Sequence, residues 1–265
     1  MSLTNGRPAA FFDLDKTIIA KSSTLAFSKP FFDSGLINRR SVLRSAYAQF
    51  VFALQGADAD QMAKMREYLT ELCTGWDVQT VRDVVAETLH SIVEPLVYEE
   101  AVRLISDHQE AGRDVVIVSA SGTEVVEPIA DLLGADRVIA TRLVVAEGKY
   151  TGEIEYYAYG ANKATAMAEL ADAAGYDLAS SYAYSDSETD VPMLEAVGYP
   201  YAVNPDRTLR RLADGRGWEI LQFGRPVGLR SRMVDSTPTK VAAGLALGAV
   251  SAGVVASRLR KRARD

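Results

Sequence analysis

The sequence predicts an α/β protein with a doubly wound, Rossmann-like parallel sheet, and three observations favour this fold class. Of the 265 residues, 48% are hydrophobic and 24% are charged, which is typical of a soluble globular protein with one large domain or a core with a smaller insert. Helical patterns alternate with apolar runs along most of the chain. Each apolar run is short and ends at a small or acidic polar residue, as buried parallel strands do; the runs lie at 9–13, 114–119, 181–186 and 200–204.

The first expected strand, 9–13, is followed by a long segment without strong strand patterns. Residues 22–93 instead show helical periodicity that is interrupted by glycines. The expected helices lie at about 22–34, 38–54, 58–73 and 77–90, with breaks near Gly35, Gly56 and Gly75. This segment therefore predicts a helical insert between the first strand and the rest of the sheet.

Beyond the insert, strands alternate with helices. The expected helices lie at 97–111, 123–133 and 161–174. Thr123 is expected to be the N-cap of the second, and Gly175 ends the third. Residues 142–155 alternate apolar and polar side chains around Glu147-Gly148, which predicts a β-hairpin. Because a doubly wound sheet binds its ligands at the carboxyl ends of its strands, we expect the polar strand ends to share one site.

Composition excludes several classes of protein. The single cysteine, Cys73, cannot form an intramolecular disulfide, and with His90 and His108 as the two histidines the chain has no Cys/His cluster for a structural zinc. The net charge of −6 argues against broad nucleic-acid binding. The apolar run beginning at Ala9 meets Asp13 too soon to be a signal peptide. We therefore expect a cytoplasmic protein with no nucleic-acid partner.

Two aspartates lie at the end of the first expected strand. Asp13 and Asp15 are two residues apart, a spacing that aims both carboxylates at the same side of an extended chain. Paired carboxylates suit a hard cation such as Mg²⁺, which would also neutralise an incoming phosphate group. The alternative is a pair of solvated loop acids.

Polar residues also lie at the ends of later strands. Ser119 and Ala120 precede a helix start, where an anion is favoured; an N-cap serine is the alternative. Lys163 lies near a helix start, where the helix dipole disfavours a cation, so it indicates a role other than helix stability, unless it is a solvated lysine. Asp186 and Asp190 belong to an acidic run, and Asp190 alternatively caps the next helix. Their order at successive strand ends favours a shared site.

These residues belong to four motifs in a fixed order along the chain. The motifs are DLDKT at 13–17, VVIVSAS at 115–121, Lys163 in GANKATA, and YSDSETD at 184–190. Together they resemble the motifs of haloacid dehalogenase superfamily phosphatases, in particular the subfamily IB hydrolases that include phosphoserine phosphatases. The resemblance implies a catalytic core made of 1–20 and 94–224, with an α-helical cap domain at 21–93 inserted after the first motif.

The resemblance also implies hydrolysis of a phosphomonoester in two steps. Asp13 would be the nucleophile that forms an aspartyl-phosphate, and Asp15 would protonate the leaving alcohol and then deprotonate water. Lys163 would offset the charge on the nucleophile and the intermediate. The residues expected to bind the phosphate are Thr17, Ser119, Ala120 and Lys163.

Mg²⁺ is the cofactor that the resemblance implies. Its expected ligands are the Asp13 side chain, the Asp15 backbone carbonyl and the Asp186 side chain. Asp190 would orient Lys163 or a metal-bound water from behind these ligands.

The expected substrate is a small phosphorylated metabolite, and alternatives remain. In phosphoserine phosphatases a glutamate just after the first motif binds the substrate ammonium, whereas 20–24 here contain no carboxylate; we therefore expect phosphoserine not to be the preferred substrate, unless Glu67 or Glu71 takes this role. A lipid phosphate is another alternative, and a catalytically idle, membrane-tethered binding protein is one of a different class. The bases that would favour a more anionic substrate are Lys21, Lys29, Arg39, Arg40 and Arg44.

The last 41 residues differ from the rest. Residues 225–265 hold nine basic and two acidic side chains, a charge of +7 that leaves −13 for the remainder. Within them, 241–257 are uncharged and 258–264 are mostly basic. Seventeen residues is the lower limit for spanning a bilayer, and a span would place the basic cluster outside, against the positive-inside tendency. The alternatives are binding of 241–264 to an anionic membrane at the inner face of the cell membrane, or a packed or flexible tail.

Overall fold

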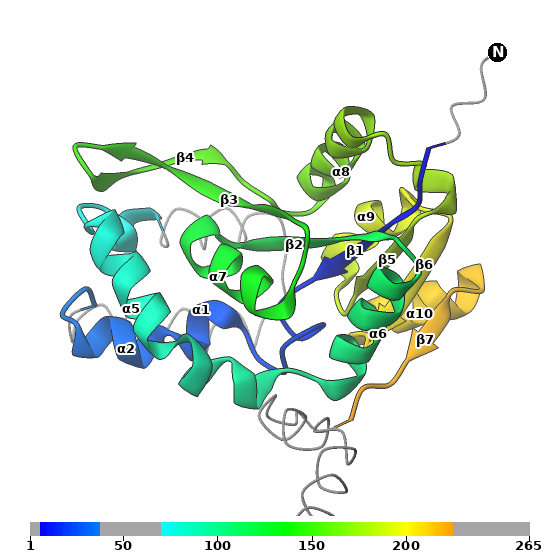
Figure 1. Ribbon diagram of the computed structural model, residues 1–265, viewed down its shortest axis with the longest axis horizontal. Helices are drawn as coiled ribbons and strands as arrows, with labels where there is room; N and C mark the ends of the chain where they lie inside the picture. The colour runs from blue at the N-terminus through cyan, green and yellow to red at the C-terminus, as the bar shows by residue number, and fades with distance from the viewer. Residues whose placement is uncertain (1–5, 38–69, 225–265) are drawn as a thin grey trace, which may run out of the picture. The chain divides into compact units, whose positions relative to one another are not determined.

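A seven-stranded sheet is the framework of the computed structural model, which describes residues 6–37 and 70–224 (Figure 1). The strand order is β4-β3-β2-β1-β5-β6-β7, and every neighbouring pair is parallel except β3 and β4. The strands are β1 (Ala9–Asp13), β2 (Asp114–Gly122), β3 (Arg137–Ala146), β4 (Lys149–Tyr156), β5 (Tyr182–Ser185), β6 (Tyr199–Val203) and β7 (Glu219–Leu221).

Helices cover both faces of this sheet, so the predicted doubly wound α/β fold is confirmed. The helices of the core are α6 (Glu99–Glu110), α7 (Thr123–Leu133), α8 (Ala161–Ala174), α9 (Val191–Glu195) and α10 (Arg207–Arg216). Short 3₁₀ helices lie at η1 (Glu94–Leu96), η2 (Leu178–Ser180) and η3 (Glu188–Asp190). On one face, Phe11 of β1 packs in a core with side chains of α8, α9 and α10. On the other, Phe12 contacts His108 of α6. Because β1 is buried on both faces, its sequence is a continuous apolar run.

The segment between β1 and α6 is helical where it is described. It contains α1 (Ser23–Ala26), α2 (Ser28–Asp33) and α5 (Val78–Ile92), and α5 packs against α7 of the core. The expected single helix at 22–34 is two helices that meet at Phe27, because Pro30 has no N–H to donate to the carbonyl of Ala26. The expected helix at 38–54 and most of that at 58–73 lie outside the described residues.

The N-cap expected at Thr123 is wrong. Strand β2 continues past Ser119 through an irregularity in its pairing with β3 and ends at Gly122, which is the N-cap of α7. The Thr123 hydroxyl donates instead to the backbone oxygen of Thr141, at 3.1 Å. Gly175 ends α8 in the left-handed conformation, as predicted.

The hairpin predicted around Glu147-Gly148 is confirmed as β3 and β4. Both turn residues have positive φ, 50° and 77°, as a tight two-residue turn requires. The hairpin also bonds to the chain that enters α5: Gly75 N–H donates to Tyr150 O at 2.8 Å, Tyr150 N–H to Trp76 O at 3.0 Å, and Val78 N–H to Gly148 O at 2.9 Å. These bonds join the inserted segment to the edge of the core.

Within residues 6–37 and 70–224, no helix is both long enough and apolar enough to cross a membrane. The apolar stretch at 241–257 and the basic cluster after it lie outside this range.

Candidate active site

The carboxyl end of β1 places Asp13 between two serines. In the parallel register, Asp13 pairs with Val118 of β2, so Ser119 is the next residue beyond it, and Phe12 pairs with Tyr184 of β5, so Ser185 lies on the other side. All three side chains are buried. The strand ends therefore converge as the sequence predicted.

Lys163 connects two of the predicted aspartates. It is only 3% exposed, and its Nζ donates to Asp13 Oδ1 at 2.7 Å and to Asp190 Oδ2 at 2.8 Å. Ser185 Oγ donates to the same Asp190 oxygen at 2.7 Å. Burial alone would lower the pKa of Lys163, but Asp13 and Asp190 outweigh burial and raise it, so Lys163 is a stable cation. The solvated-lysine alternative is wrong.

Asp190 stands at the N-cap position of α9, but its side chain makes no capping hydrogen bond. Its carboxylate is turned instead toward Lys163 and Ser185. This arrangement holds the Lys163 ammonium beside Asp13.

The site carries more negative charge than Lys163 neutralises. Burial raises the pKa of Asp13 to about 8; Lys163 opposes this shift, while Asp190, Asp186 and Asp15 add to it. Burial likewise raises the pKa of Asp186 to about 7, with Lys16 opposing and Asp190 adding. In both cases burial is the main cause, and the neighbouring carboxylates add to it while the nearby lysine opposes it.

A divalent cation fits this donor set. Among the described residues no three His, Cys, Asp or Glu side chains are placed to hold a metal together, so a site here would use the Asp13 and Asp186 carboxylates with a backbone carbonyl such as that of Asp15. Mg²⁺ is suited to such a site, because it keeps several waters and takes only one or two protein carboxylates.

Asp15 lies in a tight turn after β1 and is held by two serines. Its Oδ1 accepts from Ser23 N–H at 2.7 Å and its Oδ2 from Ser121 Oγ at 3.2 Å. Lys16 adopts a positive φ of 63°, which few side chains tolerate and which turns the chain sharply at this point. Burial raises the pKa of Asp15, against the effect of the Ser23 N–H. The predicted acid therefore favours its protonated form more than an exposed aspartate does.

The residues expected to bind phosphate lie in the same region. Thr17 is fully buried, and among the described residues its hydroxyl has no hydrogen-bonding partner. A buried, unpartnered hydroxyl is costly unless a ligand satisfies it. Ser119 lies inside β2 and the N-cap of α7 is Gly122, so the N-cap alternative for Ser119 is wrong. Ser119 Oγ accepts the backbone N–H of Ser121 at 3.2 Å, and the carbonyl oxygen of Ala120 accepts the Thr141 hydroxyl at 2.7 Å.

Sequence reasoning missed the serines that hold the two acids. Ser121 and Ser185 both lie inside the recognised motifs, and their positions at strand ends were a usable signal. Ser23 gave no such signal, because its contact with Asp15 depends on the turn at Lys16.

A pocket of about 210 Å³ opens beside these residues. Ala120, Ser121 and Gly122 form part of its wall together with the start of α7, and the rest comes from the inserted segment, the β3–β4 hairpin and the residue that follows the hairpin. Glu124, which lines this pocket, was not predicted from the sequence.

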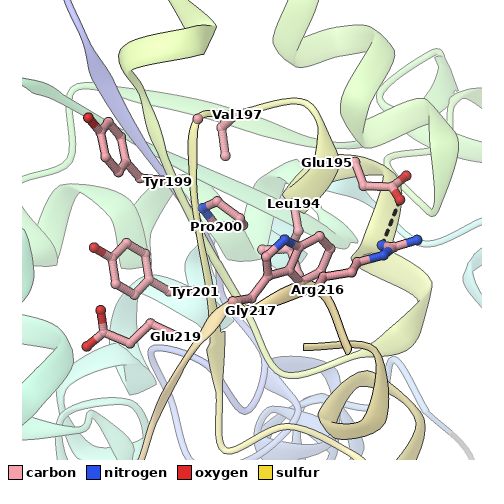
Figure 2. Close-up of a pocket in the computed structure, with 11 residues that line it drawn as sticks. Leu194, Glu195, Val197, Tyr199, Pro200, Tyr201, Arg216, Gly217 and Glu219 are labelled. Carbon is pink, nitrogen blue, oxygen red and sulfur yellow. Dashed lines mark ion pairs between the residues drawn. The ribbon is translucent and has the colours of Figure 1, made fainter. Parts of the chain in front are cut away.

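A second hollow of about 480 Å³ lies elsewhere (Figure 2). It is lined by the residues that begin β6 and β7, and so lies at the amino ends of these strands, away from the four motifs. Figure 2 shows Arg216 paired with Glu195, at 2.6 Å, and the Arg216 guanidinium also lies over the Trp218 ring. None of the predicted site residues lines this hollow.

Comparison with known proteins agrees with this geometry. The haloacid dehalogenase-like hydrolase family matches residues 10–195. The chain is 63% identical to the "Inhibition of morphological differentiation protein" of Streptomyces azureus, over 97% of this chain and 95% of that one. It is 60% identical to a "probable phosphatase" of Mycobacterium tuberculosis, over 97% and 90% of the two chains. It is 34% identical to a phosphoserine phosphatase of the same species, over 96% and 82%.

Solved structures are similar as well. A protein from Bordetella pertussis superposes with a TM-score of 0.73 and 29% identity, over 82% of this chain and 99% of its own. A substrate-bound phosphoserine phosphatase gives 0.59 at 20% identity, over 81% and 92%, which supports the fold alone.

Proposed function

The chain belongs to the haloacid dehalogenase-like hydrolase family, and we propose that this phosphatase is a Mg²⁺-dependent phosphomonoesterase that acts on a small phosphorylated metabolite through an aspartyl-phosphate. The observation that carries the proposal is the state of Asp13. Its Oδ1 is held by Lys163, and among the described residues none donates a hydrogen bond to Oδ2. One oxygen is thus fixed and the other is available as a nucleophile.

In the first step, Asp13 Oδ2 forms a bond to phosphorus as the bond from phosphorus to the ester oxygen breaks. Asp15 gives its proton to the leaving oxygen, and its raised pKa supports this acid role. In the second step, Asp15 takes a proton from water while the water oxygen attacks phosphorus, and Asp13 leaves as a carboxylate. Protons and phosphate balance over the two steps.

Three side chains would stabilise the phosphoryl oxygens during both steps. The Lys163 ammonium lies against Asp13, and Ser119 lies one residue beyond the β2 partner of Asp13. The Thr17 hydroxyl gains the partner that it lacks among the described residues. Preorganised donors of this kind cost no reorganisation at the moment of reaction.

Asp13, Asp186 and the backbone carbonyl of Asp15 would hold Mg²⁺, and the unbalanced negative charge at these residues supports this assignment. When bound, the cation supplies charge neutralisation to the phosphate. Asp190 would act by positioning Lys163.

The segment 21–93 would act as a cap on a core of 1–20 and 94–224. Its described helices α1, α2 and α5 border the pocket next to Asp15, so they would exclude water and select the ester.

The test is hydrolysis of methyl phosphate and p-nitrophenyl phosphate with and without Mg²⁺, combined with acid quenching and mass spectrometry of the peptide that contains Asp13. The proposal requires Mg²⁺-dependent release of phosphate and a phosphate adduct on this peptide. Full activity in the presence of a chelator, or no adduct at any time, would contradict it.

Phosphoserine hydrolysis is the second candidate, because a relative that is 34% identical is named a phosphoserine phosphatase. The chain itself lacks a carboxylate at 20–24, Glu71 is exposed, and Glu67 lies outside the described residues. A substrate screen that ranks phosphoserine first in kcat/KM would favour this candidate over the first.

Membrane association through 241–264 stays a separate proposal, which bears on the alternatives of a lipid phosphate and of a tethered binding protein. Deleting everything after Pro238 should release the chain from anionic vesicles and leave hydrolysis of methyl phosphate unchanged, since all four motifs precede residue 191. If the full chain does not bind such vesicles at low salt, this proposal fails.

A further inference from the structure

The pocket beside Asp15 is bounded by apolar side chains from three separate parts of the chain. Leu25 and Phe31 come from α1 and α2, Trp76 precedes α5, and Leu143 and Ile154 come from the β3–β4 hairpin. Trp76 also contacts the Phe31 ring, with ring centroids 5.6 Å apart. These contacts make one apolar wall out of the inserted segment and the hairpin.

The position of this pocket decides which part of a substrate would enter it. Ser121 lines the pocket, and its hydroxyl donates to Asp15 Oδ2 at 3.2 Å. An acid that protonates the leaving oxygen must lie within hydrogen-bonding distance of it. The alcohol part of the ester, which begins at this oxygen, would therefore extend from Asp15 into the pocket.

The charge of the pocket restricts what this alcohol can carry. Among its described lining residues, Glu124 is the one charged side chain. Glu124 already has partners, since Tyr150 donates a hydrogen bond to it and an Arg82 guanidinium nitrogen lies 3.9 Å away. Burial raises the pKa of the Cys73 thiol to about 12, so this lining residue is uncharged. The described lining thus offers no cation to a second anionic group.

Two of the bases that would favour an anionic substrate are described, and neither supplies a cation to this pocket. Lys21 and Lys29 are both exposed and neither lines the pocket, and Lys29 pairs with Asp33. Arg39, Arg40 and Arg44 lie outside the described residues.

We propose that the alcohol released by this enzyme is neutral, apolar and compact, so that the substrate class is the phosphate monoesters of short aliphatic or benzyl-type alcohols. This inference rests on the proposed phosphatase function and specifies its leaving group. An alcohol with a carboxylate or a second phosphate would lose the solvation of that group without gaining a partner. A volume of about 210 Å³ limits the size, because drug-sized ligands occupy pockets of roughly 300 to 1,000 Å³.

The first test uses the unmodified protein and a series of n-alkyl phosphates, whose leaving groups differ little in acidity. Each buried methylene should raise kcat/KM about fourfold, mainly through KM, until the pocket is full and the increase stops. Benzyl phosphate should exceed phosphoserine and glycerol phosphate. A flat series, or a preference for phosphoserine or glycerol phosphate, would overturn the inference.

The second test compares two tryptophan variants. Trp76→Ala should lower kcat/KM for hexyl phosphate about tenfold and change that for methyl phosphate less than about twofold. Trp218→Ala, in the hollow of Figure 2, removes the same side chain away from the motifs and should change neither. Equal losses for both esters in Trp76→Ala would overturn the assignment of the pocket. A lack of hydrolysis of every ester, methyl phosphate included, would instead overturn the proposed function.

Discussion

The charged site and the apolar pocket meet at Asp15 but are built in different ways. In the site, direct polar bonds fix the charged groups: Lys163 is bonded to Asp13 and Asp190, and Asp15 to two serines. Most of these groups lie at the ends of strands in one sheet. The pocket wall comes from separate segments of the chain that contribute apolar side chains. The rigid sheet thus carries the chemistry, and the inserted helices and the hairpin carry selection of the ester.

This difference separates two kinds of variant. A change in the charged site should affect every ester, whereas a change in the pocket should affect esters according to their alcohol. Kinetics with a large ester and a minimal ester can therefore show whether the site and the pocket act independently.

The largest effect is expected for Asp13→Asn. The amide keeps the shape of the side chain but removes the nucleophile, so kcat should fall by about four orders of magnitude for hexyl and methyl phosphate alike. Steady-state kinetics measure the loss, and circular dichroism serves as a control for folding. A loss restricted to one of the two esters would place Asp13 outside the chemical step.

Lys163→Met should cost about 3 to 5 kcal/mol in the free energy of unfolding, because it leaves the buried Asp13 and Asp190 without their cation. Urea denaturation measures this cost. The loss in the free energy of unfolding should shrink as pH falls toward about 4. At that pH the carboxylates of the unfolded chain also take up protons, so the raised pKa of Asp13 in the folded protein no longer lowers stability. Lys29→Met is the matched control, because its pair with Asp33 is exposed and should contribute under about 1 kcal/mol.

Asp15→Asn should lower kcat by about 10² to 10⁴ for methyl phosphate, which needs an acid to release its alcohol. The rate of the first step should fall less for p-nitrophenyl phosphate, because its phenol leaves readily without an acid. Burst kinetics separate formation of the intermediate from its hydrolysis. Equal losses of the first step for both esters would argue against the acid role.

The smallest effect is expected at Gly152 in β4. Its φ is 91°, and a Cβ there would lie 2.2 Å from Thr74 Oγ1, so Gly152→Ala should destabilise the fold by about 1 to 3 kcal/mol and raise KM for hexyl phosphate. Gly148→Ala controls for backbone strain alone, since its φ is 77° and nothing lies within 4 Å. Adding Thr74→Ala to Gly152→Ala should restore the part of the stability loss that exceeds the loss in Gly148→Ala, as measured by thermal unfolding. If it restores nothing, the clash between residue 152 and Thr74 is contradicted.

The same contrast explains how much the sequence predicted. The strand ends could be predicted from the sequence, because burial on both faces produces an unbroken apolar run and the next polar residue marks its end, as at Asp13. Strand β7 was missed, since Glu219–Leu221 is too short to show a period, and so was the first half of β3. The break at Phe27 was also missed, although Pro30 was visible in the sequence.

The pocket could not be predicted from the sequence at all. Its wall joins residues such as Leu25 and Leu143, which are far apart in the chain and have no local pattern that relates them. The same holds for Glu124, whose partners Arg82 and Tyr150 come from two other elements. Only the packing of the inserted segment against the hairpin creates these neighbours.

The backbone bonds between the hairpin and residues 75–78 also limit how readily the wall of the pocket opens. Moving the inserted segment away from the hairpin would break these three hydrogen bonds or bend the hairpin at the pairing irregularities beside Leu143. At about 1 kcal/mol net for each bond, breaking them leaves roughly one molecule in a hundred open at any moment. Amide hydrogen exchange at Gly75, Val78 and Tyr150 would report the free energy of this opening directly.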